Sequence, residues 1–265
     1  MRLEGKTAIV IGAGQGPGTG MGNGRATVLK FAQEGARVMA VDRDLASARE
    51  TAAMAKPPGE CFAFEADVTR EATLAAAIAE AKKCWGRIDI LHYNVGVSIA
   101  GGDASPTEIT EEAFDRVVAI NLRGAVMACK HVLPIMREQR SGCILMISSL
   151  AAVEKYPLVA YKATKAAMIA YTEQLAIQNA EFGVRANVIL PGLMDTPMAV
   201  DTRARATGKS RAEIAAMRDA RVPLRHKMGT GWDVANAALF LASDEAGFIT
   251  GVSLLVDGGG ALNTG

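Results

Sequence analysis

Residues 7–27 read TAIVIGAGQGPGTGMGNGRAT: a short apolar run, a glycine-rich turn and the start of a helical pattern. Thr7 to Ile11 is predicted to be a strand, and a glycine occupies every even position from 12 to 24. A strand that leads through glycines into a helix forms an anion site, because backbone N–H groups approach a phosphate and the helix dipole favours its charge. A flexible surface loop is the alternative interpretation of this run.

An acidic residue supports the first interpretation. The second apolar run ends at Asp42, eighteen residues after Gly24. A carboxylate there can accept hydrogen bonds from the hydroxyls of an adenine ribose and would repel the 2′-phosphate of NADP. The pair of signals predicts a dinucleotide site that prefers NAD. Asp42 could instead be an ordinary turn residue, and the adjacent Arg43 could attract a phosphate.

Apolar runs and helical patterns alternate from one end of the chain to the other. The predicted strands are 7–11, 37–41, 61–65, 88–93, 143–148, 185–190 and 252–256, and the predicted helices are 24–33, 45–55, 71–85, 111–137, 157–181 and 232–243. Most strands are apolar throughout, as expected for parallel strands that are covered on both faces. The sequence therefore predicts one α/β domain over residues 1–265, a doubly wound parallel sheet of about seven strands with helices on both faces.

Residues 193–227 interrupt this alternation. They contain six Arg and two Lys but only four acidic residues. The segment is either a lid over a substrate or a solvated helix pair, and we favour the lid because long insertions at this edge of a sheet tend to be functional. Its positive excess suggests an anionic substrate, with Arg203 and Arg205 as candidate contacts.

Composition excludes several other classes of protein. The 265 residues are half hydrophobic and carry a formal net charge of +1, which gives no field that would attract nucleic acid. The four cysteines and three histidines show no zinc spacing, so no metal is expected, and reduced thiols suit the cytoplasm. We expect no secretory leader, and no apolar stretch that would span a membrane.

Three groups of polar residues are candidates for catalysis. Tyr161 and Lys165 are four residues apart and therefore share a helix face, where an ammonium would lower the pKa of the phenol and make it a usable acid or base. Ser148 and Ser149 end a strand, where a hydroxyl can bind a substrate oxygen. Asn121 lies in an apolar helix and needs hydrogen-bond partners if it is buried, although it could simply bend the helix.

In their order and spacing these residues resemble the short-chain dehydrogenase/reductase family over nearly the whole chain. The matching positions are Gly12, Gly22 and Gly24, Asp42, Asp67-Val68, Asn94 to Gly96, the tetrad Asn121, Ser149, Tyr161 and Lys165, Pro191-Gly192 with Thr196, and Val256 to Gly259. The resemblance implies a Rossmann-like fold and an NAD-dependent oxidoreductase that acts on a secondary alcohol or ketone. It also implies a homotetramer, by analogy with family members of this size.

The same resemblance assigns roles to individual residues. Tyr161 would exchange the hydroxyl proton, Ser149 would polarise the substrate oxygen, Lys165 would hold the nicotinamide ribose, and Asn121 would anchor a water molecule. The implied cofactor contacts are Gly12, Gly22, Asn23, Gly24, Asp42, Asp67, Val68, Asn94, Gly96, Tyr161, Lys165, Pro191, Gly192, Met194 and Thr196.

The chain also departs from the family pattern. Its glycine turn is several residues longer between Gly14 and Gly22 and could form a flap over the pyrophosphate or a subunit contact. Tyr93 and Val95 are larger than the residues usual beside Asn94. The spacing from Ser149 to Tyr161 is one residue short, which keeps Ser148 as an alternative. An NADP-dependent carbonyl or 3-oxoacyl-type reductase and a non-catalytic NAD(H)-sensing protein are the alternative functions.

Overall fold

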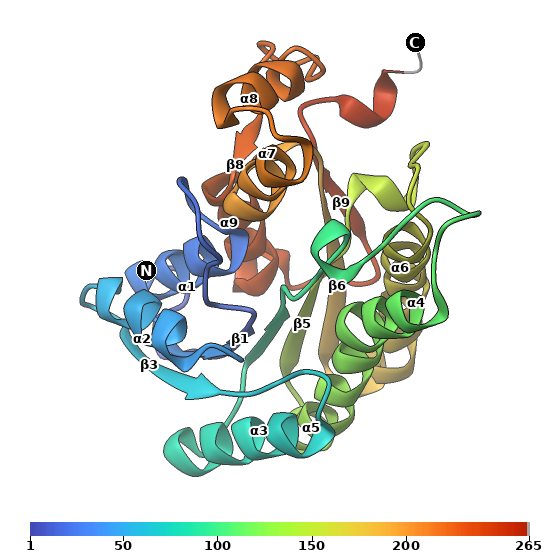
Figure 1. The fold of residues 1–265 in the computed structure, drawn as a ribbon. Coiled ribbons are helices and arrows are strands. Elements are labelled where there is room, and N and C mark those ends of the chain that lie inside the picture. Colours follow the sequence, from blue (N-terminus) through green and yellow to red (C-terminus); the bar gives the residue numbers. More distant parts are fainter. Residues whose placement is uncertain (264–265) are drawn as a thin grey trace.

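The computed structural model describes residues 1–263 and contains a seven-stranded sheet of order β3-β2-β1-β4-β5-β6-β9 (Figure 1). Its strands are β1 (Thr7–Ile11), β2 (Arg37–Asp42), β3 (Glu60–Glu65), β4 (Ile90–Tyr93), β5 (Gly142–Ile147), β6 (Val184–Pro191) and β9 (Ser253–Val256). All neighbouring strands are parallel, which confirms the predicted sheet. The strand order reverses between β1 and β4, and ligands of such sheets bind beyond the carboxyl ends of the strands at that point.

Helices cover both faces of the sheet, as predicted. One face carries α1 (Asn23–Gln33), α2 (Leu45–Met54) and α9 (Gly231–Ala242), and the other carries α3 (Glu71–Trp85), α4 (Glu111–Val118), α5 (Gly124–Gln139) and α6 (Val159–Asn179) (Figure 1). The helix that begins at Glu111 is capped by Thr110, whose hydroxyl accepts a hydrogen bond from the N–H of Ala113. The acidic residues that follow this cap suit the positive end of the helix dipole.

The core explains why the strands read as continuous apolar runs. Ile9 and Ile11 of β1 pack into the cluster under α3, α5 and α6, whereas Ala8 and Val10 pack into the cluster under α1 and α9. Successive side chains of a strand point to opposite faces, and here both faces are buried. Burial on both sides fixes the strand register and therefore the positions of the residues that follow each strand.

The predicted helix over 111–137 differs in detail from the observed one. A wider π-helical turn, Ala119–Arg123, separates α4 from α5, and such turns often occur at functional sites. By length and composition alone, the continuous stretch Glu111–Gln139 is long and apolar enough to cross a membrane, which the sequence analysis did not expect. In this fold α5 instead packs against α3 and the sheet, and α4 packs against α6.

The basic segment forms a small helical unit at the carboxyl edge of the sheet. It contains β7 (Met194–Asp195), a π-helical turn (Pro197–Asp201), α7 (Thr202–Thr207) and α8 (Arg211–Asp219), and β7 pairs with β8 (Gly229–Thr230). α7 and α8 lie together at the end of the sheet (Figure 1). Their own apolar cluster, which includes Val200, Ile214 and Val222, makes them a packed unit rather than an irregular loop.

Candidate active site

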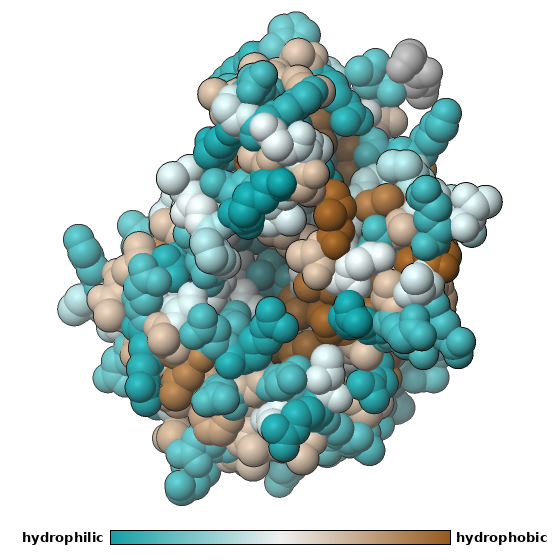
Figure 2. All heavy atoms as spheres, viewed as in Figure 1, coloured by the Kyte–Doolittle hydropathy of each residue, from teal (hydrophilic) through white to brown (hydrophobic). Residues whose placement is uncertain are grey.

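A cavity of about 630 Å³ opens at the carboxyl ends of the strands, between the sheet and the α7–α8 unit. Figure 2 shows the surface hollowed there, with apolar residues along one wall. Of the catalytic and cofactor-binding residues named from the sequence, the structure brings all except Asn121 together at this cavity. These are Gly12, Gly22, Asn23, Gly24, Asp42, Asp67, Val68, Asn94, Gly96, Ser149, Tyr161, Lys165, Pro191, Gly192, Met194 and Thr196.

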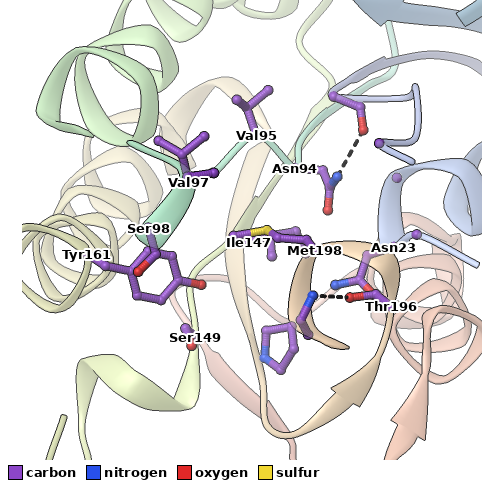
Figure 3. Close-up of a pocket in the computed structure, with 18 of the residues that line it drawn as sticks. Asn23, Asn94, Val95, Val97, Ser98, Ile147, Ser149, Tyr161, Thr196 and Met198 are labelled. Atoms are coloured by element: carbon purple, nitrogen blue, oxygen red, sulfur yellow. Dashed lines mark hydrogen bonds between the residues drawn. The ribbon is translucent and has the colours of Figure 1, made fainter. Parts of the chain in front are cut away.

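The glycine turn forms a tight cradle at one end of the cavity. Asn94 Nδ2 donates a hydrogen bond to Gly12 O at 2.9 Å, and a Cβ at Gly24 would lie 1.9 Å from the same oxygen (Figure 3). No side chain can therefore be tolerated at Gly24. The N-terminus of α1 has no side-chain cap, which leaves its N–H groups available for an anion.

One buried acceptor in the cradle has no partner. Asn23 Oδ1 is shielded from solvent yet receives no hydrogen bond from any described residue. Buried polar atoms are nearly always satisfied, and Asn23 lines the cavity, where a hydroxyl or amide group of a bound ligand would supply the missing donor. The uncapped helix, the glycine contact and this acceptor together fit a phosphate-bearing dinucleotide.

Two carboxylates follow β2 and β3 at the same edge. Asp42 accepts hydrogen bonds from the N–H groups of Gly14, at 2.9 Å, and Asp44, at 3.1 Å, so it braces the glycine turn. Burial works against ionisation of Asp67, but hydrogen bonds from Thr69 and nearby arginine charges outweigh it and lower the pKa of Asp67. Asp67 is therefore ionised at neutral pH.

Tyr161 and Ser149 face each other across the opposite end of the cavity (Figure 3). The pKa of Tyr161 is raised, contrary to the sequence expectation, because desolvation outweighs the other influences on the phenol. A hydrogen bond from Ser149 and the charges of Arg203 and Arg218 act in the opposite direction. The phenol therefore stays protonated at neutral pH and is a proton donor.

Lys165 lies one turn further along α6 and is almost fully buried. Its ammonium donates to Ile147 O at 2.6 Å and lies 5.7 Å from the centroid of the Tyr161 ring. Desolvation lowers the pKa of Lys165 to about 7. The hydroxyl of Ser148, by contrast, donates to Lys165 O at 2.6 Å and so ties β5 to α6, which leaves Ser149 as the serine that faces the phenol.

Asn121 lies behind the cavity, in the π-helical turn, and is completely buried. Its Oδ1 accepts from Val97 N at 2.8 Å, while Nδ2 donates to Val97 O at 2.9 Å and to Thr164 Oγ1 at 3.1 Å. The amide therefore joins the segment after β4 to α6. The hydrogen bonds of this buried amide are therefore made with segments outside its own helix.

The two large residues beside Asn94 have different positions. Tyr93 is buried in the core, where its hydroxyl donates to Ile120 O at 2.6 Å. Val95 lines the cavity and packs close to Gly12. Tyr93 thus changes the packing behind the site, whereas Val95 contributes to the cavity wall.

Arg218 was not recognised from the sequence, and Arg205 does not lie where the sequence suggested. Arg203 and Arg218 line the cavity, but Arg205 is exposed and donates to Pro17 O at 3.3 Å. Ile214 and Arg218 are the buried positions of α8, spaced four residues apart, and this spacing was the available signal. The spacing by itself did not show that Arg218 points inward, because all the arginines of the segment carry the same charge.

Comparisons with known proteins give relatives that match nearly the whole chain. A family model described as Enoyl-(Acyl carrier protein) reductase matches residues 18–261. The chain is 34% identical to oxidoreductase UcpA of Salmonella typhimurium, covering 98% of this chain and 96% of that protein. It is also 34% identical to the 3-oxoacyl-[acyl-carrier-protein] reductase FabG of Thermotoga maritima, covering 98% and 99% respectively. A crystal structure of a short-chain dehydrogenase/reductase from Burkholderia xenovorans superposes with a TM-score of 0.91 at 42% identity, covering 100% of this chain and 99% of that one.

Proposed function

Since the chain belongs to the short-chain dehydrogenase/reductase family, whose members act on CH–OH groups with NAD or NADP, we propose that it transfers hydride between NAD and a secondary alcohol or ketone. One observation carries the proposal: Tyr161, Ser149 and Lys165 meet at one end of a cavity whose other end is a glycine cradle. A nicotinamide bound in this cavity would supply the hydride acceptor or donor.

The chain's own residues handle the proton and the substrate oxygen. The protonated phenol of Tyr161 donates its proton to a ketone oxygen during reduction. In the oxidation direction the phenolate form of Tyr161, which the charges of Arg203 and Arg218 favour, takes the hydroxyl proton of the alcohol. Ser149 holds that oxygen beside the phenol, and Lys165 holds the nicotinamide ribose next to Tyr161. Asn121 fixes the backbone of Val97 and Thr164 at the back of the site, besides its inferred role of anchoring a water molecule.

Asp42 supports NAD rather than NADP as the cofactor. Its carboxylate lines the cavity at the end of β2, where it would repel a 2′-phosphate. Two observations favour an NADP-dependent 3-oxoacyl-type reductase as a second candidate. Arg43 lines the same cavity, and one of the relatives is named as a 3-oxoacyl reductase.

Parallel fluorescence titrations of the purified protein with NADH and NADPH decide between these cofactors. We expect NADH to bind at least about 10-fold more tightly, and Asp42→Ala to reduce that ratio. Tighter binding of NADPH would transfer the proposal to the reductase.

Replacing Tyr161 with phenylalanine separates an enzyme from an NAD(H) sensor. The variant loses the proton that the reaction requires, so kcat should fall at least about 100-fold while NADH binding stays within twofold. Tyr156, which also lines the cavity, provides a matched control in Tyr156→Phe. A wild-type protein that binds NADH but oxidises or reduces none of a broad panel of alcohols and ketones would contradict the enzyme proposal.

We also propose a cytoplasmic homotetramer. The cysteines Cys61, Cys84, Cys129 and Cys143 are free thiols, which suits a reducing compartment. The family is generally oligomeric, and the tetramer rests on analogy with members of this size.

A further inference from the structure

Two arginines lie at the catalytic end of the cavity. Arg203 comes from α7 and Arg218 from α8, and both line the cavity together with Ser149 and Tyr161. Arg218 is only 9% exposed. Arginine is rarely this buried unless a partner compensates the charge, because desolvation of a guanidinium is costly.

Neither guanidinium is neutralised within residues 1–263. The ion pairs of the same segment involve other cations: Arg211 pairs with Asp195 and Asp201, and Lys227 pairs with Asp219. No carboxylate of the described chain lies within 4.0 Å of Arg203 or Arg218. Two cations therefore share one cavity without a counter-charge at contact distance.

The hydrogen bonds of Arg218 are also incomplete. Its Nε lies 3.3 Å from Met228 Sδ, and its Nη2 donates to Met194 O at 3.4 Å, both weak contacts. Its Nη1 has no partner among the described residues, although a guanidinium has five N–H donors. Arg203 uses one nitrogen, Nη1, to donate to Ala199 O at 2.8 Å. Unused donors are therefore left on Arg203 and Arg218 at the cavity.

The positive charges of Arg203 and Arg218 act on each other and on Tyr161. Burial and the charges of Arg203 and Arg221 lower the pKa of Arg218 to about 10, so it remains a cation at neutral pH. The positive charges of Arg203 and Arg218 also stabilise the anionic form of Tyr161. An oxyanion is the ligand that matches a pair of guanidiniums in geometry and in charge.

We propose that the substrate carries an oxyanion, most simply a carboxylate, which Arg203 and Arg218 bind while its alcohol or ketone oxygen lies at Ser149 and Tyr161. The proposal rests on the oxidoreductase function proposed above and adds a substrate class: hydroxy acids and oxo acids. Cofactor phosphates have their own cradle at Gly24, at the other end of the cavity, which argues against the pyrophosphate as the anion.

Kinetics with matched substrates test the proposal. Short-chain hydroxy acids and their primary amides are nearly the same in shape, but only the acids carry a negative charge and two acceptor oxygens, so wild-type kcat/KM should favour the acids at least about 10-fold. Arg218→Met and Arg203→Met should each lower kcat/KM for the acids about 10- to 100-fold and leave the amides within threefold. Arg205→Met is the matched control, since Arg205 lies on the same helix as Arg203 but outside the cavity lining, and it should change neither value.

Two outcomes would overturn the proposal. One is an equal loss of kcat/KM for acids and for amides in the Arg218→Met variant. The other is a raised KM for NAD with an unchanged preference for acids over amides, which would mean that the arginines bind the cofactor. Neither arginine has an ion-pair partner among the described residues, so the methionine variants leave no buried carboxylate unpaired and should fold, and the melting temperature of each variant checks this.

A binding measurement keeps this proposal separate from the proposed function. Unreactive carboxylates and their amides are titrated calorimetrically into the NADH-saturated protein. Tighter binding of the carboxylate, abolished by Arg218→Met and retained in Arg205→Met, would support the anion site even if no alcohol is turned over. Equal binding of carboxylate and amide to the wild type would refute the site even if neutral alcohols are substrates.

Discussion

His92 shows how an ionisable residue in the core can affect stability. It is completely buried in β4, neither ring nitrogen has a hydrogen-bond partner among the described residues, and its ring packs edge-on to Phe31. Desolvation lowers the pKa of His92 from 6.5 to about 3. In this pH range the unfolded chain binds a proton that the folded chain does not, so stability falls as the pH drops below about 6.5.

Replacement of His92 with leucine should remove this pH dependence. Between pH 7 and pH 5 the wild type should lose roughly 2 kcal/mol more of its unfolding free energy than the variant. Urea denaturation at both pH values measures the difference. Parallel changes in the two proteins would show that His92 is not the titrating group.

The adjacent serines should behave differently. Ser148→Ala removes the hydroxyl that binds Lys165 O and should cost about 1 kcal/mol of stability with little change in kcat. Ser149→Ala should lower kcat about 100-fold or more, because its hydroxyl faces Tyr161, and should also cost about 1 kcal/mol of stability, because the same hydroxyl accepts a hydrogen bond from the N–H of Ala151. The opposite pattern would make Ser148 the catalytic serine.

At the scale of elements, the extended glycine turn contacts the α7–α8 unit. Thr19 N donates to Asp201 Oδ1 at 3.4 Å, and Arg211 Nη2 donates to Thr19 O at 3.4 Å. Gly18 has a φ of +146°, and a Cβ there would lie 2.5 Å from Asp201 Cγ, so a glycine is required for this approach. The extended glycine turn thus contacts the basic segment, and these contacts are long enough to be individually weak.

These contacts predict that the glycine turn and the α7–α8 unit are coupled. Arg211→Ala breaks the bond to Thr19 and the pairs with Asp195 and Asp201, and it should raise KM for NAD about 3- to 10-fold. Proteolysis between α7 and α8 should become faster, since opening of this segment costs less. Lys209→Ala, which removes an exposed lysine from the same segment, serves as the control. An unchanged KM and cleavage rate would show that the glycine turn and the α7–α8 unit act independently.

At the scale of the molecule, exposed apolar side chains on α4 and α6 suit a subunit interface. Phe114 is 39% exposed and Ile177 is 74% exposed, and the two helices pack side by side. We expect a tetramer in light scattering and a smaller species for Ile177→Lys, because a buried charge disfavours an apolar contact. Met54→Lys, on α2 at the other face of the sheet, should leave the mass unchanged. An intact Ile177→Lys tetramer would place the interface elsewhere.

The sequence alone determined the parallel sheet and the cofactor end of the site. A parallel strand that is covered on both faces is apolar at every position, so an apolar run predicts such a strand. The residue after each strand then lies at the carboxyl edge of the sheet. For this reason Gly24, Asp42, Asp67 and Asn94 could be placed at one cavity before the structure was known. Tyr161 and Lys165 could be placed on one face of a helix because they are four residues apart.

Tertiary structure alone decided which of several similar residues points into the site. Ser148 and Ser149 are neighbours in sequence, yet one binds α6 and the other faces the phenol. Arg203, Arg205 and Arg218 are equally basic, but only packing of α7 and α8 on the sheet shows which of them line the cavity. Desolvation also reversed the expected pKa shift of Tyr161. Orientation and burial depend on contacts between distant segments, and local sequence patterns do not contain those contacts.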